Sequence, residues 1–98
     1  MSMPKHGRRD DGEHELIKFA RQFGWRCWKL DRPCDWLALR RGVWYALEIK
    51  NPDCKGHADE YTMDQRKFMA EAFAAGGRVL VWRTQADVLA DSNARVSA

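Results

Sequence analysis

Two short segments rich in apolar residues, 34–39 and 43–50, are separated by Arg40, Arg41 and Gly42. This pattern predicts a β-hairpin, because a glycine at the turn readily takes the positive φ that a tight connection needs. Apolar side chains fall on both faces of each predicted strand. We therefore expect both faces of the sheet to be covered.

The rest of the chain alternates between helical and extended patterns. Apolar residues at helical spacing predict helices over 10–23 and 62–75, short apolar runs predict strands over 25–30 and 78–83, and Thr84 can begin a short helix through Leu89. Thr62 and Gln65 have the spacing of a capping box. The order αβββαβ predicts an α/β fold with a mixed four-stranded sheet flanked by helices, in which the last strand pairs in parallel.

The hairpin register places acidic side chains opposite each other. If the loop consists of Arg41 and Gly42, Asp35 falls opposite Glu48, and Lys50 projects from the same face as Glu48. A three-residue loop would shift this register by one position. Like charges directly opposed in a sheet are destabilising, and a divalent cation between them removes that cost. Oxygen ligands suit Mg²⁺ or Mn²⁺, and a lysine beside them completes the parts needed for metal-assisted phosphodiester hydrolysis.

Each candidate also has a plain structural explanation. Asp35 could be a surface residue at the start of a strand, and Glu48 and Lys50 could be paired by chance. Glu13 lies at the inner edge of the apolar stripe of the first helix, where it either joins the acidic site or complements the helix dipole. Gln65 either serves only the cap of its helix or reaches the metal-site water or a phosphate oxygen.

Composition limits the class of protein. The chain has 98 residues with 45% hydrophobic and 32% charged residues, which indicates one folded domain over 10–90, a flexible basic arm over 1–9 and a tail over 91–98. No apolar run reaches transmembrane length and no signal-peptide core is present, so a cytoplasmic location is expected, that of the host cell if a phage encodes the chain. Three cysteines favour reduced thiols. No membrane partner or small-molecule cofactor is expected.

The net charge of +3 and the pI near 8.9 are compatible with a polyanionic partner. No helix-turn-helix or other base-reading module is evident, so shape and phosphate contacts should dominate DNA recognition. The candidate DNA contacts are Arg40, Arg41, Lys55, His57, Arg66 and Lys67.

Asp35 followed by Glu48-Ile49-Lys50 resembles the motif of the PD-(D/E)XK nucleases, with the proline of the motif displaced to Pro33. The wider pattern adds Glu13, Asn51-Pro52, Thr62-x-x-Gln65-x-x-Phe68 and Gly76-Gly77. It resembles the stand-alone VRR-NUC nucleases of phages and bacteria, although a clear Val-Arg-Arg sequence is missing. It is also similar to archaeal Holliday junction resolvases, and the likeness covers nearly the whole chain.

This resemblance implies a restriction-endonuclease-like core and a metal-dependent endonuclease. Asp35, Glu48 and the backbone carbonyl of Ile49 would bind Mg²⁺ or Mn²⁺, and Lys50 would position or activate the attacking water. Glu13 would complete the acidic site, as a possible further metal ligand, and Gln65 would assist nearby. A homodimer acting on Holliday junctions or other branched DNA is the expectation carried over from this group.

Two other hypotheses remain open from the sequence. The first is a nucleic-acid-binding module that has a nuclease-like fold without catalysis, which predicts salt-sensitive binding and no metal-dependent cleavage. The second is an interaction domain stabilised by zinc at Cys54 and His57, whose spacing is ligand-like.

Overall fold

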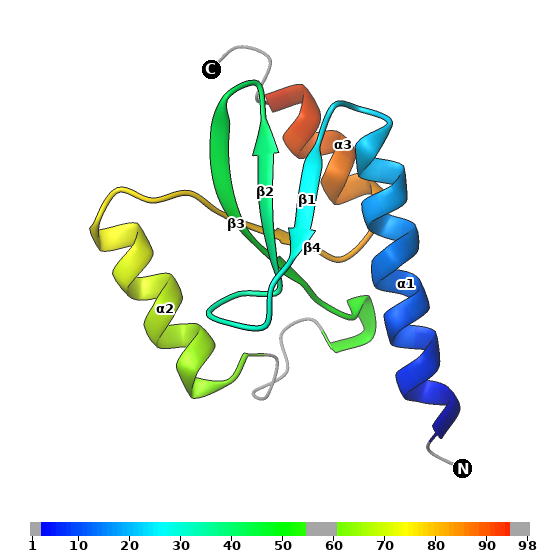
Figure 1. The fold of residues 1–98 in the computed structure, drawn as a ribbon. Coiled ribbons are helices and arrows are strands. Elements are labelled where there is room, and N and C mark those ends of the chain that lie inside the picture. Colours follow the sequence, from blue (N-terminus) through cyan, green and yellow to red (C-terminus); the bar gives the residue numbers. More distant parts are fainter. Residues whose placement is uncertain (1–2, 55–60, 95–98) are drawn as a thin grey trace.

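The structure, a computed structural model, describes residues 3–54 and 61–94 of the chain. Its elements are α1 (Met3–Arg21), β1 (Arg26–Lys29), β2 (Trp36–Arg40), β3 (Val43–Ile49), a short 3₁₀ helix (Pro52–Cys54), α2 (Met63–Ala74), β4 (Val79–Trp82) and α3 (Gln85–Ala94) (Figure 1). The predicted order of elements is confirmed. α1 begins earlier and α3 ends later than expected, so helices reach into the segments 1–9 and 91–98 that were expected to be an arm and a tail.

The sheet has the strand order β1-β2-β3-β4. β1 pairs antiparallel with β2 and β2 with β3, whereas β3 and β4 are parallel, as the intervening helix predicts. Arg40 pairs with Val43, which confirms the two-residue loop. Arg41 has φ 53° and Gly42 has φ 77°, and two consecutive positive φ values are typical of the type I′ hairpin turn.

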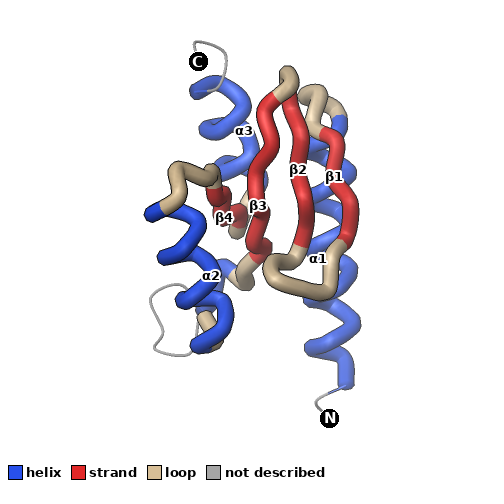
Figure 2. The backbone as a smooth tube through the Cα atoms, turned by 60° about the vertical axis from the view of Figure 1, so that its left-hand side comes forward, coloured by secondary structure: helices blue, strands red, loops and turns tan. Residues whose placement is uncertain are grey.

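The hydrophobic core lies between the sheet and the pair α1 and α3, which cover the same face (Figure 2). Trp25 and Trp82 meet edge to face with ring centroids 5.1 Å apart. The indole N–H of Trp25 donates to the hydroxyl of Ser92, 2.9 Å away, and so joins the start of the sheet to α3. The buried side chains of this core cluster are Leu16, Ile17, Ala20, Trp25, Cys27, Trp36, Ala38, Tyr45, Leu47, Ile49, Leu80, Trp82 and Val88.

The opposite face of the sheet is only partly covered, and the expectation of two covered faces is wrong. Trp28 is 48% exposed and Trp44 is 54% exposed on this face. α2 packs against the β4 side and leaves β1 and β2 open (Figure 2). α2 itself contains no buried residue, and the stripe expected to be buried, Phe68, Met69 and Ala72, is half-buried. We refer below to the face of the sheet that carries Trp28 and Trp44 as the open face.

Arg40 has a structural position. Its side chain is 7% exposed, its Nε donates to the carbonyl oxygen of Phe23 at 2.9 Å, and its Nη1 donates to that of Ser92 at 3.0 Å. The guanidinium also lies over the ring of Trp25. These contacts tie the end of α1 to α3, so Arg40 is not available as the DNA contact that the sequence predicted.

No helix in the described parts of the chain combines the length and the apolar character that crossing a membrane requires.

Candidate active site

Asp35 and Glu48 lie side by side at one end of the open face. The last hairpin pair is Trp36 with Leu47, and the next step along the ladder brings Asp35 opposite Glu48, as predicted. Asp35 Oδ2 accepts a hydrogen bond from the backbone N–H of Ile49 at 2.9 Å. This bond fixes the Asp35 side chain against the end of β3. Nothing in these contacts tests the expected role of the Ile49 carbonyl oxygen.

Glu48 is fully buried, and its environment disfavours its charge. Burial is the largest cause that raises its pKa, from an ordinary 4.5 to about 7. The charge of Asp35 contributes to this rise, and the charge of Lys50 opposes it. Among buried side-chain polar atoms of the described residues, Glu48 Oε2 alone has no hydrogen-bond partner. A buried acceptor of this kind is costly unless another group satisfies it.

Lys50 is also buried and faces Glu48. Its Nζ lies 3.7 Å from Glu48 Oε1 and donates to Gln65 Oε1 at 2.9 Å. The ammonium group sits over the ring of Tyr61, 4.8 Å from the centroid. Sequence reasoning did not single out Tyr61. The sequence did contain a signal for this contact: Tyr61 directly precedes Thr62, the N-cap of α2, and the start of α2 lies beside Lys50.

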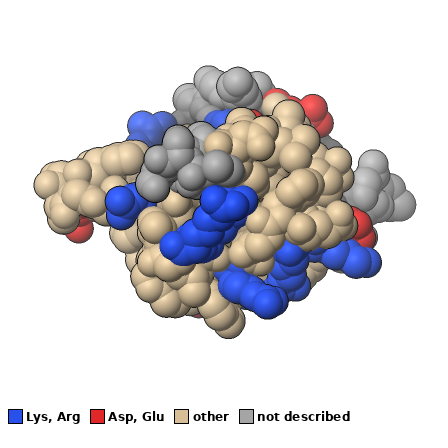
Figure 3. Space-filling view, turned by 90° about the horizontal axis from the view of Figure 1, so that it is seen from above, with Lys and Arg blue, Asp and Glu red and all other residues tan. Residues whose placement is uncertain are grey.

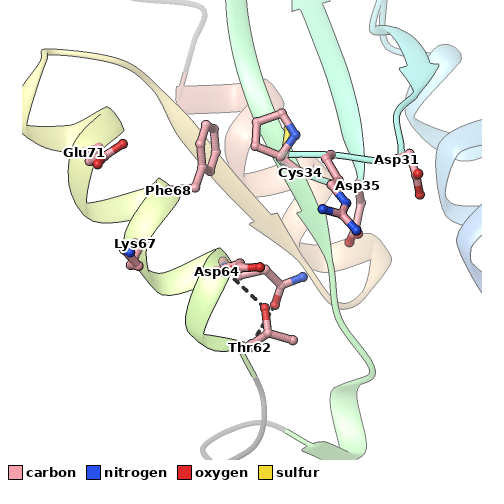
Figure 4. A pocket seen from close by; sticks show the side chains of 11 residues that line it. Asp31, Cys34, Asp35, Thr62, Asp64, Lys67, Phe68 and Glu71 are labelled. Atoms are coloured by element: carbon pink, nitrogen blue, oxygen red, sulfur yellow. Dashed lines mark hydrogen bonds between the residues drawn. The ribbon is translucent and has the colours of Figure 1, made fainter.

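Gln65 caps α2 and also contacts Glu48 and Lys50. Its backbone N–H donates to Thr62 Oγ1 at 3.1 Å, and its Oε1 accepts from the Thr62 backbone N–H at 3.0 Å, which completes the predicted capping box (Figure 4). Its Nε2 donates to Glu48 Oε1 at 3.1 Å while its Oε1 accepts from Lys50. The first turn of α2 therefore holds Glu48 and Lys50 in one hydrogen-bonded group.

A groove of about 500 Å³ opens beside this group, between α2 and the segment that leads into β2 (Figure 4). It is lined by Asp31, Arg32, Pro33, Cys34, Asp35, Thr62, Asp64, Gln65, Lys67, Phe68 and Glu71. Cys34, which the sequence did not connect with the site, is buried, and its thiol donates to the carbonyl oxygen of Trp36. Burial raises the pKa of that thiol, so it stays protonated next to the two carboxyl groups.

The structure gives Glu13 other partners than the acidic site. Its Oε1 accepts from Lys29 Nζ at 3.0 Å and from the indole N–H of Trp36 at 3.2 Å. Trp36 follows Asp35 directly and points to the opposite face of the sheet, where α1 packs. No hydrogen bond or ion pair of Glu13 within the described residues involves Asp35, Glu48 or Lys50.

This placement predicts the behaviour of Glu13→Gln. Glutamine keeps an oxygen that accepts from Lys29 and Trp36, and the lost ion pair involves a Lys29 side chain that is 55% exposed, so stability should fall by less than about 1 kcal/mol. Any metal-dependent activity of the protein should stay within about three-fold of the wild type, because the contact is structural. Rates and unfolding midpoints of both proteins check this; a loss of 100-fold or more would return Glu13 to the site.

The predicted basic contacts separate into different regions. Arg41 is exposed at the hairpin turn, beyond Val43, which is itself about 17 Å along β3 from Glu48. Arg66 and Lys67 are exposed on α2, where Lys67 lines the groove. Lys55 and His57 lie outside the described residues, as does the side chain of Cys54, so the zinc alternative is not tested.

The donors available for a cation are the carboxylates of Asp35 and Glu48. Within residues 3–54 and 61–94 no group of three or more His, Cys, Asp and Glu side chains has a metal-holding arrangement. The chemistry of the pair fits a hard divalent ion, because Glu48 Oε2 is buried without a partner and two like charges face each other. Comparisons with protein-family models, with curated proteins and with solved structures give no match to this chain.

Proposed function

We propose that this protein is a metal-dependent endonuclease that hydrolyses DNA phosphodiester bonds at Asp35, Glu48 and Lys50. The observation that carries the proposal is the buried, unsatisfied Glu48 beside Asp35 and Lys50. Burying the ionisable side chains of Glu48 and Lys50 beside a half-buried aspartate costs stability, and such arrangements concentrate at functional sites. The αβββαβ order and the mixed sheet are compatible with a restriction-endonuclease-like core.

Asp35 and Glu48 would hold Mg²⁺ or Mn²⁺. When bound, such an ion supplies Lewis-acid polarisation of a phosphoryl oxygen and lowers the pKa of water. The chain's own groups do the rest. Lys50 would bring a positive charge to the phosphate from a buried position, where that charge acts more strongly than in bulk solvent.

Gln65 acts as a positioning residue. It holds the Lys50 ammonium and the Glu48 carboxylate in a fixed relation through one amide group. Preorganised charges of this kind need no reorganisation during the reaction. The groove next to Asp35 and Gln65 supports entry of the scissile phosphate from the side of α2, with Lys67 on its wall.

The proposal extends to branched DNA as substrate and to a homodimer as the working form, since symmetric cutting of a four-way junction needs two sites. The exposed cations at the hairpin turn and on α2 support contacts to phosphates in more than one direction.

The experiment compares cleavage of a labelled four-way junction, matched linear duplex and splayed arms with Mg²⁺, with Mn²⁺ and with EDTA. We expect metal-dependent cuts, symmetric and paired in the junction. Cleavage of all substrates alike would retain the nuclease and remove the selectivity for branches. No cleavage with any metal, together with salt-sensitive binding, would overturn the proposal in favour of a binding module.

A further inference from the structure

Two tryptophans form a pair on the open face. Trp28 in β1 lies beside Leu37, and Trp44 in β3 lies beside Leu39, so the two rings lean over β2 from opposite sides. Their centroids are 5.8 Å apart and their planes are tilted by 33°. About half of each residue is exposed, whereas Trp25, Trp36 and Trp82 are buried. The face therefore presents two neighbouring aromatic rings to the solvent.

Positive charge accompanies this surface. Arg26 pairs with Leu39, which in turn pairs with Trp44, so Arg26 stands in the same row of the open face and is exposed. Arg41 is exposed at the adjoining turn. Lys and Arg side chains gather on this end of the molecule (Figure 3). In the described strands, the residues that share this face from the Arg26 row to the Trp28 row include no carboxylate.

The pair and the candidate active site lie along one strand. Trp44 and Glu48 both belong to β3, point to the same face and are four residues apart, which is about 13 Å. A stacked nucleic-acid strand advances about 3.4 Å per nucleotide, so this distance spans about four nucleotides. A strand held at the tryptophans can therefore reach the carboxylates without a bend.

We propose that Trp28 and Trp44 form a stacking platform for unpaired bases of a DNA strand, about four nucleotides from the phosphodiester bond that is cut. Every base has a π-face, so aromatic rings bind single strands without reading their sequence, and neighbouring arginines hold the backbone. The choice of DNA as the ligand rests on the proposed function. The platform makes the protein selective for branched DNA that carries unpaired nucleotides, such as a flap or a splayed arm.

Binding of a labelled short oligothymidylate in EDTA tests the platform without any need for cleavage. Trp28→Ala and Trp44→Ala should each weaken single-strand binding about five-fold or more, because the contact between one base and one ring is lost. Trp44→Phe should retain most of the affinity and Trp44→Leu should not, since only phenylalanine keeps a π-face. Wild-type tryptophan fluorescence should be quenched during the titration.

Phe73→Ala is the matched control, because Phe73 is an aromatic side chain of α2 that is 59% exposed and not part of the pair. It should bind like the wild type. Unchanged binding by Trp28→Ala and Trp44→Ala would overturn the platform, as would equal behaviour of Trp44→Phe and Trp44→Leu. Sedimentation of the same variants detects the competing occupant, a second copy of the chain: dissociation of a dimer with unchanged single-strand binding also overturns the proposal.

The two proposals fail separately. A protein that binds oligothymidylate through the tryptophans and never cleaves DNA would refute the nuclease and keep the platform. A protein that still binds oligothymidylate and cleaves splayed arms normally after both tryptophans are replaced would refute the platform and keep the nuclease.

Discussion

Replacement of Glu48 by glutamine is expected to abolish metal-dependent DNA cleavage. The change removes the negative charge that would bind the metal ion. The glutamine side chain has the same size as glutamate, and its amide oxygen can still accept the hydrogen bond from Gln65. Loss of an outer partner of a metal ligand commonly costs 10- to 100-fold, so loss of the ligand itself should reduce the rate by at least about 100-fold. Initial rates of junction cleavage with Mg²⁺ and with Mn²⁺ measure the effect.

Glu71→Gln is the matched control for this variant. Glu71 lines the same groove from α2 and is exposed, so its loss changes the charge of the groove and leaves the buried pair intact. We expect it to cleave at close to the wild-type rate. Cleavage by purified Glu48→Gln that approaches that of Glu71→Gln would remove Glu48 from the chemistry and, with it, the proposed mechanism.

The same Glu48→Gln variant is expected to be more stable than the wild type in EDTA at alkaline pH. The folded state raises the pKa of Glu48 from 4.5 to about 7, so folding favours the protonated carboxyl group. Between these values the folded protein binds more protons than the unfolded chain, and stability falls as the pH rises through about 7. A pKa shift of this size corresponds to a loss of roughly 3 kcal/mol in the free energy of unfolding of the wild type as Glu48 ionises. The Glu48→Gln variant has no charge at this position and does not undergo this loss.

Urea unfolding of both proteins at about pH 5 and at about pH 8 checks this sign. Other titrating groups are common to the two proteins, so the difference between their pH dependences isolates Glu48. Addition of Mg²⁺ or Mn²⁺ at the higher pH should stabilise the wild type and not the variant, since the ion binds only where both carboxylates are present. Parallel curves for the two proteins would show that Glu48 is not held in a strained ionised state.

The parts of the structure that sequence predicted well depend on local rules. The hairpin register followed from the two-residue turn and the requirement for positive φ at Gly42. The pairing of Asp35 with Glu48 then followed from counting, because a strand has a period of two. The cap of α2 was visible from the spacing of Thr62 and Gln65 alone.

The parts that sequence missed depend on contacts between distant segments. The open face could not be recognised, because Trp28 and Trp44 have the apolar character of core residues and only the placement of α2 leaves them exposed. Arg40 looked like a surface cation at a turn, and the burial of its guanidinium results from the carbonyl groups of Phe23 and Ser92. Glu13 lies on the expected side of α1, but its carboxylate accepts hydrogen bonds from Lys29 and Trp36 and not from the residues of the candidate site.

The double use of Gln65 links helix formation to the competence of the site. One amide oxygen both closes the cap of α2 and holds Lys50, and α2 has no buried residue to anchor it independently. Fraying of a few residues at the start of α2 costs far less free energy than global unfolding. It would break the hydrogen bonds that Gln65 makes with Glu48 and Lys50. If the proposed nuclease activity depends on this arrangement, substitutions that only change helix propensity in the first turn of α2 should change the cleavage rate without any contact to DNA.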